Sequence, residues 1–127
     1  MKLLHLSDLH IGKRVNEFSM LEDQRYILKA LGDLAANEAV DGVLLAGDLY
    51  DKPVPPAEAV TLLDEFFTGL ARAGIPVFAI SGNHDSSERL NFGSRLMEGA
   101  GIHMAAVYRG AEEPLVLEDK HGPLYLY

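Results

Sequence analysis

The 127-residue sequence contains no cysteine and no long apolar segment. Without cysteine, the fold cannot be held by disulfides and no metal site can use thiolate ligands, which fits a reducing, cytoplasmic compartment. The apolar runs are far shorter than the roughly 20 residues that cross a bilayer, and no signal-peptide pattern opens the chain. We therefore expect a soluble intracellular protein without a membrane partner, in which only Asp, Asn and His could hold a metal.

Positive charge is also scarce. The sequence has 11 Lys and Arg residues against 19 Asp and Glu residues, a formal net charge of -8. Such a chain does not attract nucleic acid by bulk electrostatics. However, divalent cations held by several carboxylates would reverse the field at the place where a phosphate docks. The charge count therefore does not decide the substrate.

The hydrophobic residues, 48% of the chain, suffice for the core of one domain and fall into a regular order. Short apolar runs predict strands at 2–7, 42–47 and 75–80, and apolar residues at helical spacing predict helices at 20–37 and 57–73. Strands that alternate with helices favour parallel pairing through right-handed crossovers. The sequence therefore predicts an α/β fold in which the three strands share one sheet.

The remaining elements have weaker signals. Ser19, with Glu22 three residues further on, predicts a capping box at the start of the first helix. The last third of the chain predicts one helical stretch and three further strands. These lie at 90–97, 102–108, 115–117 and 124–127.

Acid, amide or imidazole side chains follow each of the first three predicted strands. They are Asp8 and His10, then Asp48 and Asp51, then Asn83, His84 and Asp85. The carboxyl edge of an open parallel sheet is where ligands bind. Residues two apart on extended backbone project to the same side, so Asp8 and His10 could hold one ion. A carboxylate oxygen and an imidazole nitrogen are suitable ligands for manganese, iron or zinc.

Other polar and small residues near these clusters have simpler interpretations. Gly47 and Gly82 each precede a polar cluster, where a side chain would obstruct a tight turn or an approaching phosphate. His5, inside the first predicted strand, is interpreted as a core histidine rather than a ligand. Four basic residues are candidate phosphate contacts, although isolated surface cations are usually just solvated. They are Lys13, Arg14, Arg89 and Arg95.

Three segments, SDLH, GDLYD and GNHD, resemble in order and spacing the opening signatures of the calcineurin-like metallophosphoesterases. The longer stretches LLHLSDLHIGKR, LLAGDLYDKPVPP and AISGNHDSSERLNFGSRL resemble the SbcD-type DNA double-strand-break-repair nucleases of that superfamily. The resemblance covers residues 1–97. It implies the layered α/β sandwich of the superfamily.

The resemblance also implies a set of metal ligands. Asp8 and His10 would bind a first metal, Asp48 would be shared by both metals, and Asn83 would bind the second. The cofactors would be two divalent ions, manganese by resemblance. At a separation of roughly 3.5 to 4 Å, such ions ionise a water molecule and clamp a phosphate for in-line attack.

Two further residues receive catalytic roles from the same resemblance. His84 would be the catalytic imidazole that protonates or steadies the departing sugar oxygen, a contribution of roughly 10² to 10⁴ in rate. Asp51 would hydrogen-bond His84 and fix its tautomer.

The family completes its site with three later histidines, one alone and two in an H-x-H pair, and the sequence contains no H-x-H. Only His103 and His121 follow His84, and neither has the expected context. We therefore expect residues 1–127 to be the N-terminal portion of a metallophosphoesterase domain, truncated after its first half. Alone it should bind two metals poorly and be nearly inactive, and its uncovered edges should favour self-association.

For the whole protein, the resemblance implies a metal-dependent DNA exonuclease and endonuclease. Its partners would be DNA and an SbcC-type ATPase, and the full-length protein would be a homodimer. Two alternatives stay open. One is a phosphatase or phosphodiesterase that acts on small phosphate esters, and the other is a scaffold fragment without a complete metal centre.

Overall fold

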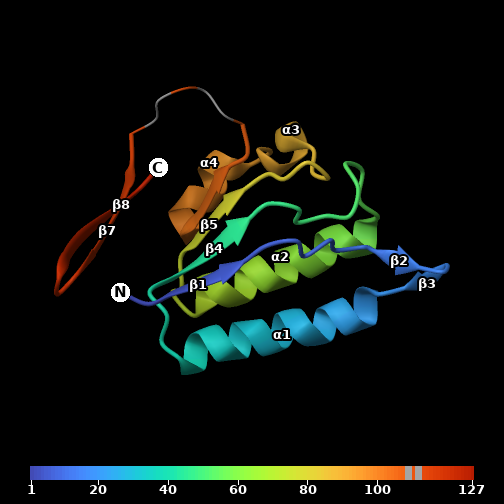
Figure 1. Cartoon of the computed structure of the whole chain (residues 1–127), viewed down its shortest axis with the longest axis horizontal. Helices are drawn as coiled ribbons and strands as arrows, with labels where there is room; N and C mark the ends of the chain where they lie inside the picture. Colours follow the sequence, from blue (N-terminus) through green and yellow to red (C-terminus); the bar gives the residue numbers. More distant parts are fainter. Residues whose placement is uncertain (108–109, 111–112) are drawn as a thin grey trace.

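The computed structural model describes residues 1–107, 110 and 113–127 (Figure 1). Its centre is a sheet of four parallel strands in the order β1-β4-β5-β6. These strands are β1 (Leu3–Leu6), β4 (Gly42–Ala46), β5 (Val77–Ile80) and β6 (Ile102–Ala105). The predicted α/β fold and the shared sheet of the first three strands are confirmed. The prediction that the fourth strand continues toward Tyr108 is wrong, because β6 ends at Ala105; Tyr108 itself lies outside the described residues.

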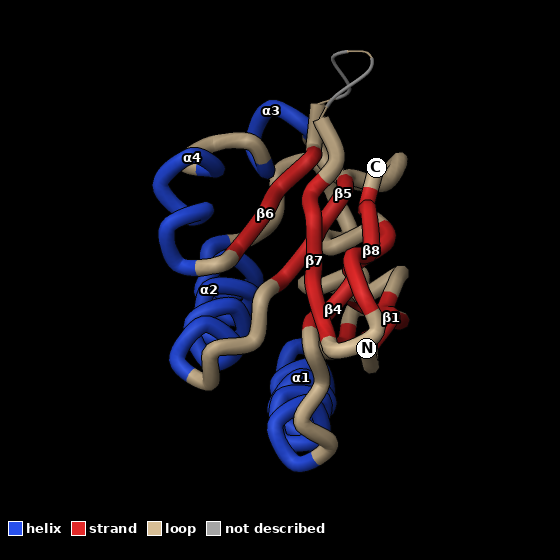
Figure 2. Tube along the Cα trace, turned by 90° about the vertical axis from the view of Figure 1, so that its left-hand side faces the viewer, coloured by secondary structure: helices blue, strands red, loops and turns tan. Residues whose placement is uncertain are grey.

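Two long helices, α1 (Leu21–Asn37) and α2 (Ala57–Arg72), cover one face of this sheet (Figures 1 and 2). The sheet order follows the chain order, so successive crossovers of the same hand place both helices on the same side. Both helices were predicted within a residue or so. In the described part of the chain, no helix combines the length and the apolar character needed to cross a membrane.

The predicted capping box at the start of α1 is wrong. Met20 is the N-cap residue and its side chain makes no capping bond. Ser19 ends strand β3 (Phe18–Ser19), which pairs with β2 (Arg14–Val15) in a small hairpin. Ser19 therefore lies one residue too early for a capping box, although its Oγ accepts a hydrogen bond from the Leu21 N–H at 3.4 Å. The hairpin itself was not predicted, because its turn uses Asn16 and Glu17 rather than glycine, although both have positive φ.

The segment after β5 is more broken than predicted. Instead of one helical stretch, it forms α3 (Ser87–Leu90) and α4 (Ser94–Met97), separated by Gly93 with φ of 73°. A short 3-10 turn, η1 (Glu98–Ala100), leads into β6.

Two further strands form an antiparallel hairpin at the end of the described chain. They are β7 (Leu115–Asp119) and β8 (Gly122–Leu126), so both predicted strands are confirmed and each is longer than expected. The hairpin lies away from α1 and α2 (Figure 2). The amino group of Met1 pairs with the Asp119 carboxylate and joins the hairpin to the start of β1.

Alternate residues of the sheet face the helices. Val43, Leu45, Val77 and Ala79 are buried in the core that α1 and α2 complete. On the opposite face, Phe78 stacks on His103 with ring centroids 5.1 Å apart. His5 lies in the same cross-strand row and is exposed, so its interpretation as a core histidine is wrong. Neither long helix covers this face.

Candidate metal centre

The loops that leave β1 and β4 stay paired beyond the sheet. The Asp8 N–H donates to the Gly47 carbonyl at 3.1 Å, and the His10 N–H donates to the Asp48 carbonyl at 2.9 Å. The loop after β5 leaves the same edge beside them (Figure 1). The polar residues of all three loops therefore meet at the carboxyl edge of the sheet, as predicted.

The backbone that presents these side chains is not extended, contrary to expectation. Asp8, His10 and Asp48 have φ of 54°, 43° and 50°, in the left-handed region. Each such residue costs of order 1 kcal/mol, and aspartate tolerates the region better than most residues. The side chains still converge, since His10 Nε2 lies 3.7 Å from Asp8 Oδ1. The predicted proximity is confirmed, but its geometric reason was wrong.

His10, Asp48 and His84 form the centre of the cluster. One donor atom from each residue lies within 4.8 Å of the other two. His10 Nε2 is 3.9 Å from Asp48 Oδ2, and the His10 and His84 rings meet edge to face with centroids 4.8 Å apart. The His10 imidazole and the Asp48 carboxylate suit a divalent transition metal, and the His84 imidazole lies close enough to act beside it.

Asp48 links two of the three loops and is itself buried, with 8% of its surface exposed. Its Oδ1 accepts a hydrogen bond from the His84 N–H at 2.8 Å. A Cβ at Gly82 would lie 2.1 Å from that same oxygen, and a Cβ at Gly47 would lie 2.9 Å from the Gly82 Cα. The two glycines are therefore required by the contact between the loops themselves.

Asp51 contacts His84 differently from the expected pairing. The group 3.0 Å from His84 Nδ1 is the Asp51 backbone carbonyl, which can only accept, so Nδ1 carries the proton. The Asp51 carboxylate turns instead toward His10, with Oδ1 at 3.5 Å from Nδ1. The tautomer of neutral His84 is thus fixed by main chain, and Nε2 is its free nitrogen.

The residues present fit a divalent cation. His10 Nδ1 is buried without a hydrogen-bond partner among the described residues, and the nearby Asp51 oxygen would suit a hydrogen bond that orients a metal-bound imidazole. His10 Nε2 then faces Asp8 and Asp48. Asn83 lies exposed beside His84 on the same loop, and its role as a ligand stays a prediction.

Gln24 of α1 holds the loop that carries His10 and had no part in the sequence-based site. Its Oε1 accepts from the Gly12 N–H at 3.0 Å, and its Nε2 donates to the carbonyls of Leu9 and His10 at 3.3 and 2.8 Å. The amide oxygen can only accept and the NH2 group can only donate, so these three hydrogen bonds fit only one orientation of the Gln24 amide. The sequence did contain a signal for this role, because Gln24 is a polar residue on the helix face that also carries Leu21 and Leu28.

Asp85 is the second residue to which sequence reasoning gave no role. Its Oδ2 accepts from the Leu49 N–H at 3.1 Å and the Gly82 N–H at 2.9 Å. Its Oδ1 accepts from the Tyr50 N–H at 2.9 Å. One carboxylate therefore joins the loop after β4 to the loop after β5.

Among the described residues beside the metal centre, Tyr50 is the one whose pKa is strongly shifted. Burial raises the pKa of its phenol to about 12, and the negative charges of Asp85 and Asp64 add to the effect. The phenol is therefore neutral at physiological pH.

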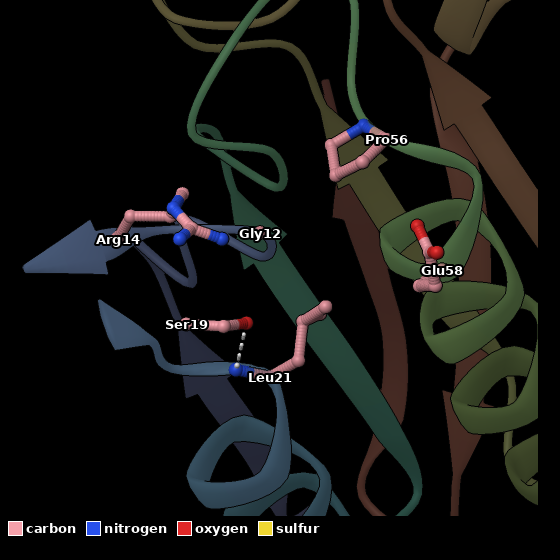
Figure 3. A pocket seen from close by; sticks show the side chains of 6 residues that line it. All are labelled: Gly12, Arg14, Ser19, Leu21, Pro56 and Glu58. Atoms are coloured by element: carbon pink, nitrogen blue, oxygen red, sulfur yellow. Dashed lines mark hydrogen bonds between the residues drawn. The ribbon is translucent and has the colours of Figure 1, made fainter. Parts of the chain in front are cut away.

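A pocket lies between the β2–β3 hairpin and the starts of α1 and α2 (Figure 3). None of the proposed ligands lines it. Arg14, a candidate phosphate contact, lines this pocket opposite Glu58, and its guanidinium donates to the Glu17 carbonyl. Its full lining is Gly12, Arg14, Ser19, Leu21, Pro56 and Glu58.

Comparison with known proteins identifies the family of the chain. The SbcD subunit of the nuclease SbcCD from Staphylococcus epidermidis is 40% identical over 118 residues, which are 92% of this chain and 32% of the relative. The corresponding protein of Staphylococcus saprophyticus is 37% identical over 92% of this chain and 31% of its own length. The chain thus spans about a third of the length of these relatives, and the expected resemblance to the SbcD type is confirmed. Residues 1–123 match the calcineurin-like phosphoesterase family, and the chain belongs to that family.

Proposed function

We propose that the chain is the amino-terminal part of a metal-dependent DNA nuclease that hydrolyses phosphodiester bonds. The observation that carries the proposal is the meeting of His10, Asp48 and His84 donor atoms within 4.8 Å at the end of a parallel sheet. Support also comes from relatives that are named as nuclease subunits.

In this proposal, the cluster would form part of a centre of two divalent ions in the longer protein, and manganese is the expected metal. Asp8 and His10 bind the first ion, Asn83 binds the second, and Asp48 bridges both. Burial of Asp48 and its bond from the His84 N–H keep its carboxylate in one orientation, which suits a shared ligand. When bound, the ions supply a water of lowered pKa and neutralise the charge of the phosphate.

His84 is the proposed catalytic imidazole. Its Nδ1–H is held by the Asp51 carbonyl, and its ring is exposed, so Nε2 is the nitrogen that can reach a substrate. In the imidazolium form, Nε2–H can protonate the departing sugar oxygen. Asp51 then has two tasks, because its carbonyl orients His84 and its carboxylate faces His10.

The partners of the proposed nuclease follow from the names of its relatives. Those relatives are subunits of an SbcCD nuclease, which implies DNA as substrate and an SbcC-type ATPase as partner. We propose both for the longer protein, together with a homodimer.

The test compares substrates in a full-length protein that carries residues 1–127. We expect manganese-supported cleavage of linear duplex DNA and little hydrolysis of a cyclic nucleotide or a small phosphate ester. The reverse preference would favour a small-substrate phosphatase or phosphodiesterase.

Substitution of His84 by Gln tests the catalytic role in the same protein. We expect cleavage to fall by roughly 10² to 10⁴ while manganese binding survives, because the substitution removes the proton donor and leaves the main ligands. His5→Gln is the matched control, since His5 is exposed on β1 outside the cluster. Full cleavage activity in the His84 variant would refute the role.

A further inference from the structure

We propose that Asp85 is a positioning residue that sets the distance between two ligand-bearing loops. Its carboxylate accepts main-chain hydrogen bonds from Leu49 and Tyr50 on one loop and from Gly82 on the other. The proposal deepens the proposed function, and it rests on that function only where metal binding is concerned.

Two of the three donors stand directly beside the proposed ligands. Leu49 follows Asp48, and Gly82 precedes Asn83 and His84 along the chain. In the part of the chain that the structure describes, Asp85 is the only acceptor found for these three N–H groups. A movement of Asp85 would therefore release both loops at the residues next to the ligands.

A carboxylate suits this position better than an amide. Its two oxygens accept all three hydrogen bonds, and the negative charge strengthens them. Asparagine has one acceptor oxygen, and its NH2 group would face an N–H donor. Alanine would leave the N–H of fully buried Leu49 without a partner.

The close contact at Gly82 fixes the distance between the loop after β4 and the loop after β5 within narrow limits. A Cβ at Gly82 would overlap Asp48 Oδ1, and that oxygen also accepts the His84 N–H. The Asp85 bonds and the Asp48 bond thus hold the same pair of loops from two sides. Loss of the Asp85 bonds is expected to widen the 4.8 Å cluster without disturbing the sheet.

Amide hydrogen exchange on the 127-residue chain, without metal, is the first measurement. In Asp85→Asn, the amides of Leu49, Tyr50 and Gly82 should exchange at least about tenfold faster, while strand amides of β4 keep their protection. Asp23→Asn, which changes an exposed acid of α1, should leave all of them unchanged. Unchanged exchange of the three amides in Asp85→Asn would overturn the proposal. A uniform acceleration that includes the strands would also overturn it, since the carboxylate would then support the whole fold.

Cobalt absorption is the second measurement, because the visible bands of Co²⁺ report coordination geometry. Titration with Co²⁺ alone should give weaker or altered bands in Asp85→Asn than in the unsubstituted chain. Identical bands in a variant whose three amides exchange rapidly would refute a link between Asp85 and the ligands. If the unsubstituted chain binds no Co²⁺, the metal centre fails for this chain, and exchange alone decides the role of Asp85.

Discussion

At the scale of single residues, the centre depends on backbone conformations that few residue types adopt. The left-handed φ of Asp8, His10 and Asp48 aims three side chains into one space. Residue spacing on an ideal strand predicted that Asp8 and His10 would meet, but it could not predict this conformation. Nor could it predict that Asp51 would use its carbonyl for His84, because main-chain contacts depend on how loops pack rather than on residue identity.

Tyr50 gives a prediction about stability at high pH. Its pKa is raised to about 12, so the fold favours the neutral phenol. The stabilisation is complete below pH 10, the ordinary pKa of tyrosine, and declines as the pH rises from 10 toward 12. The loss should stay under roughly 2.7 kcal/mol, because Tyr50 is partly exposed.

Denaturant unfolding between pH 9 and pH 12 measures this effect, with Tyr50→Phe as the comparison. The Phe variant has no phenol to ionise and should lose less stability than the unsubstituted chain over that interval. Parallel curves for the two proteins would mean that Tyr50 ionises as freely in the fold as in the unfolded chain.

At the scale of secondary structure, periodicity was informative where apolar residues alternate with polar ones over a whole element. It predicted α1 and α2 because burial on one face determines that pattern, while short apolar runs predicted the first three strands of the sheet. It missed the β2–β3 hairpin, whose strands are two residues each and are exposed. It also merged α3 and α4, because a glycine at position 93 leaves the helical spacing intact while its positive φ interrupts the helical backbone just before α4.

Gln24 provides the prediction at this scale, because it couples α1 to the loop of His10. Gln24→Ala should lower the free energy of unfolding by about 1–3 kcal/mol, since the Gly12 N–H and the Leu9 carbonyl lose this partner and the His10 carbonyl keeps only the Lys13 N–H. It should also weaken metal binding through His10. Denaturant unfolding and Co²⁺ titration measure the two effects, and Asp23→Ala on the exposed side of α1 is the control. Equal stability of the two variants would contradict the coupling.

At the scale of the whole molecule, the chain matches its family over residues 1–123 and spans about a third of the length of its SbcD-type relatives. The truncation after the first half of the domain, which we expect from the absence of an H-x-H pair, stays a prediction. The sheet face that carries Phe78 and His103 has no helix over it, and Ile80 on that face is 50% exposed. Self-association of the isolated chain stays a prediction.

Metal stoichiometry is the prediction for the isolated chain. Calorimetric titration with Mn²⁺ should not show two tight sites, because the proposed ligands Asp8, His10, Asp48 and Asn83 do not complete two coordination shells. A full-length protein that carries residues 1–127 should bind two ions in the same titration. Two tight sites in the isolated chain would contradict the expectation.

The attachment of the two loops through Asp85 uses amide protons, which every residue except proline provides. Position 50 can therefore change its side chain over evolutionary time while the loops stay joined. Homologues could therefore carry different side chains around their substrates while the two loops keep the same arrangement. Mutational scanning should find that proline is the least tolerated replacement for Tyr50.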